Sequence, residues 1–369
     1  MRYRTTESLL VVRGDMIDGR KNLIYLQCNS AQDDKGIKKI VTMIISNKIP
    51  RPLFDKDDTY SLRGVCMLAI IVHHLFQYTR AKYGITYPLP VVLILQDWGY
   101  LATAVFFLIS GYGTSLSLWK KKQNLIDNAR RIGKLYTPFL FYFFIGFAIL
   151  LTQGILIGNY IGLVSLELPV GGGKWFIICI LALYMMLMLY SAVIKDRKLI
   201  AISLVVTVLI YIMLQMTVFK EHPIWYNSVL AFPVGVSCAA WRDKIQNFNN
   251  SKTGGSILLF FLLSYTLTHF CGRSIFLMTL NDDYLRPLLQ VISSTLLALL
   301  SIRMVSMVNI QNGWLKYVGI NSLSLFLAHM VLLYTYGKIN DVYLYVFVVI
   351  SGAFTLTWIY KNTFERILN

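Results

Sequence analysis

Long apolar segments separated by short polar loops dominate the chain from about residue 60 onward. A membrane-spanning helix needs about 20 mostly apolar residues, and windows of that length find ten candidates. They are 64–82, 97–118, 136–157, 175–194, 199–219, 225–241, 255–272, 286–307, 316–336 and 342–360. The candidate at 225–241 is short, and Pro233 interrupts it. The pattern predicts an all-α polytopic membrane protein with about ten transmembrane helices.

The first 50 residues follow a different pattern. "SLLVVRG" and "NLIYLQC" resemble short strands, and "DDKGIKKIVTMIISNKIP" has the spacing of an amphipathic helix that ends before Pro50. We therefore expect two domains. A small cytosolic β/α appendage occupies residues 1–55, and the transmembrane domain occupies residues 56–369.

Composition supports the membrane class. Of the 369 residues, 56% are hydrophobic and only 14% are charged, whereas a soluble domain is about 25% charged. The net charge of +17 would suggest nucleic acid in a soluble protein, but cytoplasmic loops of membrane proteins also collect Lys and Arg. No nucleic-acid-binding motif is present, so we expect no such partner. The five cysteines form no CxxC pair, and we expect no metal site.

The basic residues also predict an orientation. With the N-terminus inside, sixteen Lys and Arg fall in the inner loops and the C-terminal tail, and seven fall in the outer loops. This bias predicts a protein of the cell membrane (inner or plasma membrane) with both termini on the cytoplasmic side. An even number of spans agrees with this orientation.

The first span, "SLRGVCMLAIIVHHLFQYT", carries ionisable groups that are costly in a membrane. Arg63 and His74 are eleven residues apart, which separates them by about 20° around a helix, whereas His73 lies about 80° from Arg63. The spacing therefore selects His74 as the partner of Arg63 on one face. These groups either line an internal site, or serve as a juxtamembrane anchor and a hydrogen-bonded core histidine.

Polar residues also form faces on two other spans. Thr103, Ser110, Thr114 and Ser117 follow one face of the second span, where such residues line either a site or a helix-packing interface. Ser322 and His329 are seven residues apart in the ninth span and share a face. A neutral imidazole is well suited to take a proton from a hydroxyl group.

The loop "KKKQNLIDNARRIGKLYTP" holds six basic residues before Pro138. Topology alone explains them. They also suit a clamp for an anionic cofactor, because Arg and Lys bind phosphates well.

Four stretches together resemble the membrane acyltransferase 3 family of polysaccharide and cell-envelope O-acyltransferases. They are "LRGVCMLAIIVHH", whose family histidine falls on His74, "FFLISGY" with Ser110 and Tyr112, the pair Trp175–Phe176, and "GINSLSLFLAH", which ends at His329. The resemblance spans residues 60 to about 335. It implies roughly ten helices, an acyl-CoA donor on the cytosolic side and an acceptor hydroxyl on a sugar.

The chain departs from the family pattern in several places. Lys134 replaces the third arginine of the basic loop, Lys174 precedes the Trp–Phe pair where histidine is common, and Phe326 replaces a tyrosine in the last motif. Lysine lacks the planar fork of arginine, which changes the expected donor contact.

The hypothesis is an O-acyltransferase that moves an acyl group, by resemblance acetyl, from acyl-CoA to a hydroxyl of a cell-surface polysaccharide or lipid-linked sugar. His74 would be the general base, and Arg63 would hold the donor or stabilise the oxyanion. Arg130, Arg131 and Lys134 would contact the CoA phosphates. The cavity would be lined by Ser110, Tyr112, Trp175 and His329. The alternative is a transporter or flippase of a lipid-linked sugar or acyl group, which often shows repeat symmetry between its halves; we see no repeat in this sequence.

Overall fold

The computed structural model describes part of the chain. The described residues are 9–13, 23–27, 54–120, 125–152, 173–249, 262–267, 269, 284–308, 310–335 and 339–368. Side chains are excluded for the two short N-terminal segments and for 125–131, 248, 249, 307, 334, 335, 367 and 368. Contacts divide the chain into two units, Met1–Arg51 and Pro52–Asn369.

The first unit contains one antiparallel strand pair. β1 (Leu9–Arg13) pairs with β2 (Leu23–Gln27), and Val11 lies opposite Tyr25. Both strands lie inside the two stretches predicted to be extended. The helix expected at 33–50 lies outside the described residues, so the β/α appendage as a whole and the boundary at residue 55 stay predictions.

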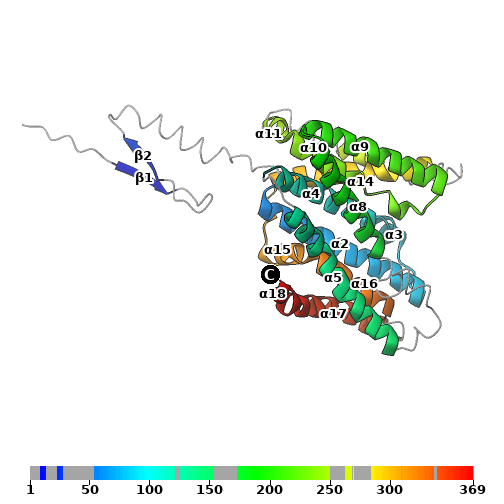
Figure 1. Ribbon diagram of the computed structural model, residues 1–369. Coiled ribbons are helices and arrows are strands. Elements are labelled where there is room, and N and C mark those ends of the chain that lie inside the picture. Colours follow the sequence, from blue (N-terminus) through cyan, green and yellow to red (C-terminus); the bar gives the residue numbers. More distant parts are fainter. Residues whose placement is uncertain are drawn as a thin grey trace, which may run out of the picture. The chain divides into compact units, whose positions relative to one another are not determined.

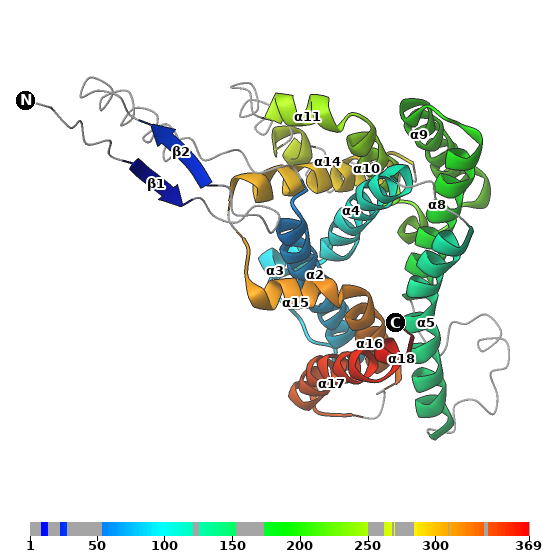
Figure 2. The same ribbon diagram turned by 60° about the vertical axis from the view of Figure 1, so that its left-hand side comes forward.

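The second unit is helical in its described part (Figures 1 and 2). Its first half contains α2 (Lys56–Tyr83), α3 (Leu89–Leu95), α4 (Trp98–Lys120), α5 (Leu125–Thr152), α8 (Lys174–Val193) and α9 (Arg197–Leu214). A π-helical turn (Gln215–Phe219) and a 3₁₀ turn (Pro223–Trp225) follow α9. The remainder contains α10 (Ala231–Ala240), α11 (Arg242–Asn249), α14 (Leu285–Met307), α15 (Gly313–Ile320), α16 (Ser322–Thr335), α17 (Val342–Asn362) and α18 (Phe364–Leu368).

Seven helices within the described residues are long and apolar enough to cross a membrane. They are Lys56–Tyr83, Leu89–Lys120, Ile132–Thr152, Lys174–Val193, Arg197–Phe219, Leu285–Ser306 and Val342–Arg366. Each coincides with a predicted span. The count rises to eight if α15 and α16 together form one span, so the prediction of ten is not confirmed; most of the candidate at 255–272 lies outside the described residues.

The candidate at 225–241 is much shorter than predicted. α10 has ten residues and a length of about 15 Å, which is half the thickness of the membrane's hydrocarbon core. Most of its side chains are buried, since α10 packs closely on α4. Its apolar composition therefore reflects burial in protein, which a hydropathy window does not distinguish from contact with lipid.

The predicted span at 316–336 is broken in the middle. α15 and α16 meet at Asn321 with a bend of 70°. The Asn321 side-chain amide donates to the carbonyl of Tyr317, which satisfies one carbonyl at the end of α15. The break places Ser322 at the N-terminus of α16, where it is buried, and α16 packs beside α2.

Glycines allow the helix backbones to approach closely where α2 crosses α15 and where α4 crosses α10. A Cβ atom on Gly64 would lie 2.1 Å from the carbonyl oxygen of Leu315, and one on Gly319 would lie 1.8 Å from that of Tyr60. A Cβ atom on Gly111 would lie 2.1 Å from the carbonyl oxygen of Phe232. Small residues permit such contacts in membrane bundles, and here they fix α2 and α4, the two helices that carry the polar stripes.

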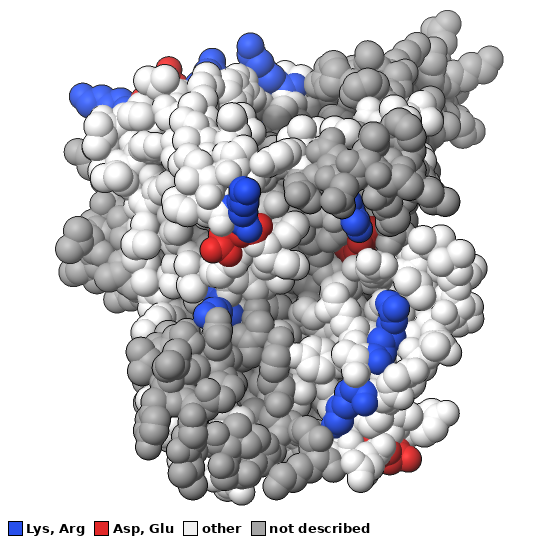
Figure 3. Space-filling model, turned by 90° about the vertical axis from the view of Figure 1, so that its right-hand side faces the viewer, with Lys and Arg blue, Asp and Glu red and all other residues white. Residues whose placement is uncertain are grey.

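The outer surface of the bundle is apolar, as a lipid-facing surface requires. Large apolar side chains are exposed on the helices of the bundle, among them Leu189, Leu199, Met213, Phe347 and Trp358. Figure 3 views the side of the bundle that lies at the right in Figure 1, where a few charged side chains, some of them basic next to acidic, lie among uncharged ones.

Candidate functional site

The described residues enclose two main cavities, which lie along α2 one after the other. The first, here called the Arg63 cavity, has a volume of about 340 Å³ and lies along the N-terminal half of α2. Its wall is largely apolar and includes Met67, Phe106, Ile109 and Phe176. Lys56 lies on its lining as well, close to the start of α2.

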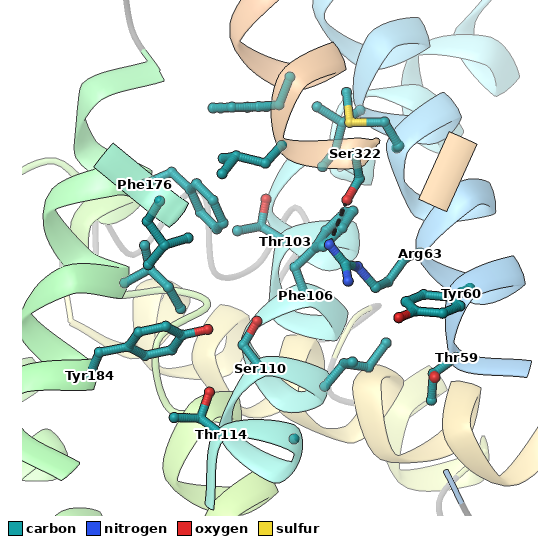
Figure 4. A pocket seen from close by; sticks show the side chains of 18 of the residues that line it. Thr59, Tyr60, Arg63, Thr103, Phe106, Ser110, Thr114, Phe176, Tyr184 and Ser322 are labelled. Carbon is teal, nitrogen blue, oxygen red and sulfur yellow. Dashed lines mark hydrogen bonds between the residues drawn. The ribbon is translucent and has the colours of Figure 1, made fainter. Parts of the chain in front are cut away.

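Arg63 joins α2 to the buried start of α16. Its Nη2 donates a 2.8 Å hydrogen bond to Oγ of Ser322, and its guanidinium carbon lies 5.8 Å from the centre of the Phe106 ring (Figure 4). Guanidinium has five N–H donors, of which the described contacts use one. The N-terminus of α16 adds a partial positive charge at the same place. This end of the cavity therefore suits a ligand group that is negatively charged or accepts hydrogen bonds.

Hydroxyl groups line the same cavity. Ser110 and Thr114 on α4 and Tyr184 on α8 point their oxygens into it (Figure 4). Among the described residues, none of these three hydroxyls makes a hydrogen bond within the protein. They are thus available to a ligand, in contrast to Thr103, whose hydroxyl donates to the carbonyl of Gly99.

The second cavity, here called the His74 cavity, is larger and more polar. It has a volume of about 890 Å³ and lies along the C-terminal half of α2. Its polar lining includes His73, His74, Gln77, Gln96, Asp97, Asn227 and Gln290, and its aromatic lining includes Tyr100, Trp175, Tyr226 and Tyr284. Ile70, Thr103 and Phe326 line both cavities, so these three side chains form the boundary between them.

His74 pairs with a second buried histidine. Its Nδ1 lies 2.8 Å from Nε2 of His329, and the two rings stack with centroids 5.1 Å apart. His329 has no exposed surface, and its Nδ1 lies 3.0 Å from the carbonyl oxygen of Leu325, one turn earlier on α16. The pair forms a second connection between α2 and α16, farther toward the C-terminal ends of both helices than the bond between Arg63 and Ser322.

The carbonyl of Leu325 determines which ring nitrogens of His329 and His74 carry protons. A carbonyl oxygen only accepts, so Nδ1 of His329 carries a proton, and in a neutral ring its Nε2 is an acceptor. Nδ1 of His74 then carries a proton and donates it in the hydrogen bond to Nε2 of His329. Nε2 of His74 is left as an unprotonated nitrogen, the form that a general base requires.

Residues 61–361 match the Acyl_transf_3 family model, which is described as an acyltransferase domain. The chain belongs to this acyltransferase family. No curated protein and no solved structure matches it. The matched range contains the whole lining of the His74 cavity and all of the Arg63 cavity's lining except Lys56, Thr59 and Tyr60. The protein is therefore a multi-pass membrane acyltransferase whose family domain includes the two-histidine site.

The structure distributes the predicted site residues over several places. Ser110 lies on the Arg63 cavity and Trp175 on the His74 cavity, while His329 is buried behind His74 and lines neither. Tyr112 also lines neither cavity: it stacks on Phe54 with ring centroids 3.8 Å apart.

The three predicted contacts to CoA phosphates lie on α5. Lys134 is exposed and is outside the lining of both cavities, although its neighbour Leu135 lines the Arg63 cavity. Arg130 and Arg131 belong to the first turns of α5, and their side chains lie outside the described part of the chain. Their role stays a prediction.

Several lining residues were not anticipated from the sequence. Tyr184 and Lys56 reach the Arg63 cavity from segments without a recognisable motif. His73 lines the His74 cavity although it lies off the stripe that Arg63 and His74 share. Phe326 sits in the last motif, and its place between the cavities gives that position a structural meaning.

Proposed function

We propose that this protein is an O-acyltransferase that moves an acyl group, most simply acetyl, from acyl-CoA to a hydroxyl of a cell-surface polysaccharide or lipid-linked sugar. The observation that carries the proposal is the pairing of His74 with His329 beside the boundary of two cavities that differ in polarity. Membership of the acyltransferase family supports the same chemistry.

The donor would occupy the Arg63 cavity. An acyl-pantetheine arm is a largely apolar chain with amide groups, and the cavity offers apolar walls, Arg63 and the hydroxyls of Ser110, Thr114 and Tyr184. Lys56 and the basic start of α5 would face the CoA phosphates, since Lys and Arg bind phosphate. By the positive-inside bias this end is cytosolic, where acyl-CoA is found.

The position of Arg63, held at Ser322, favours a role in donor binding over a role beside the thioester carbonyl carbon. Eleven residues along α2 separate it from His74, a rise of about 16 Å. Ser322, which Arg63 contacts, and His329 are separated by about 10 Å along α16. A side chain held at Ser322 is therefore too far from His74 to stabilise an oxyanion beside it, since that needs direct hydrogen-bond contact.

The acceptor would occupy the His74 cavity. Sugars carry many hydroxyls, each of which donates and accepts hydrogen bonds, together with apolar ring faces that pack on aromatic side chains. The amides of Gln77, Gln96 and Asn227 and the ring of Trp175 provide both kinds of contact. In the expected orientation this cavity is on the extracytoplasmic side. The acyl group would therefore pass from the Arg63 cavity to the His74 cavity between Ile70, Thr103 and Phe326.

The reaction would need one proton transfer in each direction. Nε2 of His74 takes the proton from the acceptor hydroxyl while the hydroxyl oxygen attacks the thioester carbonyl carbon. A C–O bond forms, the C–S bond breaks, and the departing CoA thiolate takes the proton back from His74. His329 accepts a hydrogen bond from Nδ1 of His74 throughout and stabilises the transient imidazolium. His329 is thus a positioning residue, because it acts through His74.

Transport without chemistry is the second reading of such a site. The family match favours acyl transfer. Radiolabelled acetyl-CoA incubated with the purified protein and a membrane glycolipid extract separates the two readings. Transfer predicts label in the extract that mild alkali releases, because esters hydrolyse and amides persist. Absence of both labelled product and free CoA would contradict the proposal.

A further inference from the structure

His73, the histidine next to the proposed base, has a fixed orientation of its own. Its Nδ1 lies 2.7 Å from the carbonyl oxygen of Leu95, the last residue of α3. Since that carbonyl only accepts, Nδ1 of His73 carries the proton, and Nε2 of the neutral ring is an acceptor. The side chain is 7% exposed, so little conformational freedom remains to it.

Among the described residues, none makes a hydrogen bond to Nε2 of His73, and Gly99 on α4 packs against the edge of the ring that carries it. A Cβ atom on Gly99 would lie 2.5 Å from Nε2 and 2.5 Å from Cδ2 of His73. The absence of a side chain on Gly99 therefore lets the α4 backbone approach the ring of His73 closely. Both His73 and Gly99 line the His74 cavity, and the rings of His73 and His74 have centroids 5.4 Å apart at an angle of 53°. Two neighbouring histidines therefore present acceptor nitrogens to one polar cavity.

We propose that His73 is an acceptor-binding residue, whose Nε2 accepts a hydrogen bond from a hydroxyl adjacent to the one that His74 deprotonates. This inference rests on the proposed function, and it narrows the acceptor to a vicinal diol, as sugars have. Each hydrogen bond reaches about 2.8 Å, so two adjacent hydroxyls span the separation of the two rings. The second bond fixes which hydroxyl faces His74.

Two isosteric replacements separate binding from anchoring. Asparagine places its amide N–H near the position of Nδ1, so His73→Asn keeps the bond to Leu95 and removes the acceptor at Nε2. Glutamine places its amide near the position of Nε2, so His73→Gln keeps an acceptor there and removes the bond to Leu95. Val72→Ala serves as the matched control, because Val72 is exposed on the same helix and lines neither cavity.

The test measures steady-state acetyl transfer from acetyl-CoA to the glycolipid extract by detergent-purified wild type and the three variants. The proposal predicts that His73→Asn raises KM for the extract about tenfold, the value of one hydrogen bond, and leaves KM for acetyl-CoA unchanged. His73→Gln should keep KM for the extract within about threefold of the wild type while lowering the Tm. Periodate cleaves vicinal diols, so treating the extract with periodate should abolish acetyl transfer to it.

Other results overturn the proposal in distinct ways. If His73→Asn matches the wild type in every constant, or if it lowers only the Tm, then His73 is an anchor for α3 and nothing more. If the periodate-treated extract is used as well as the untreated one, the acceptor is no vicinal diol. If the wild type itself transfers no acetyl group, the proposed function fails and this inference fails with it.

Discussion

Removing the acceptor nitrogen of His329 should impair the chemical step without affecting donor binding. In His329→Leu, Nδ1 of His74 loses its partner at 2.8 Å, and the buried leucine fills a similar volume. A hydrogen bond to a charged group contributes about 1.5–3 kcal/mol, and His74 is charged only when it has taken the proton. The loss therefore falls on the transition state and corresponds to roughly a 10- to 150-fold lower kcat.

The wrong tautomer adds to this effect. With no acceptor at Nδ1, His74 is free to carry its proton on Nε2, and that form accepts no proton from the acceptor hydroxyl. His329→Gln should recover part of the activity, because its side-chain oxygen can accept from Nδ1 of His74. KM for acetyl-CoA should not change, since His329 lines neither cavity and Ser322, which Arg63 contacts, lies about 10 Å away along α16.

The assay is CoA release with a thiol reagent in the presence of glycolipid extract. Tyr142→Phe is the matched control: it removes the 2.5 Å hydrogen bond between Tyr142 and Ser324, a buried contact between α5 and α16 outside both cavities. Buried bonds of this kind between membrane helices average about 0.6 kcal/mol, so its effect should be confined to stability. An unchanged kcat in a folded His329→Leu protein would refute the reasoning.

Three further changes test other parts of the account. Arg63→Met should raise KM for acetyl-CoA at least tenfold, because it removes a charged donor from the cavity while keeping an apolar stem, and isothermal titration with CoA measures the loss; equal CoA affinity would contradict a donor role. Gly99→Ala should raise KM for the extract and lower the Tm, because its methyl group would meet the ring of His73 at 2.5 Å, whereas Gly313→Ala, whose methyl group meets no atom within 4 Å and lies outside both cavities, should match the wild type. Tyr184→Phe should raise KM for acetyl-CoA severalfold by the loss of one hydrogen bond; an unchanged KM would place the pantetheine elsewhere.

Helical geometry alone anticipated much of the site. The eleven-residue spacing of Arg63 and His74 and the seven-residue spacing of Ser322 and His329 each predicted one face of one helix. The structure places these two faces against each other, and Arg63 meets Ser322 while His74 meets His329. The pairing of the two helices is a tertiary fact, and periodicity within each helix contains no information about it.

The same geometry explains the residues that were misplaced. Ser110 and Tyr112 belong to one motif, but two residues along a helix differ by about 200°, so one cavity does not receive both. Ser110 faces the Arg63 cavity and Tyr112 faces Phe54. His73 was set aside because it lies about 80° from the Arg63 stripe, yet the cavity at that level is wide enough to include a neighbouring face.

The prediction of membrane spans from hydropathy was incomplete for a different reason. Hydropathy predicted α2, α4 and α14 well, because each is a long apolar helix. It failed to show that α10 is short and buried, or that the chain bends by 70° at Asn321. Both features depend on close packing at glycines and on a side-chain cap, which act over one or two residues and are averaged out in a window of 20.

The central claim is that Nε2 of His74 takes the proton of the acceptor hydroxyl. The most direct test is turnover of acetyl-CoA by purified wild type and His74→Ala with glycolipid extract as acceptor, together with CoA binding to both proteins. The account predicts that His74→Ala binds CoA as the wild type does and loses at least a hundredfold in kcat, the usual contribution of a general base. A folded His74→Ala protein that transfers acetyl at the wild-type rate would contradict it.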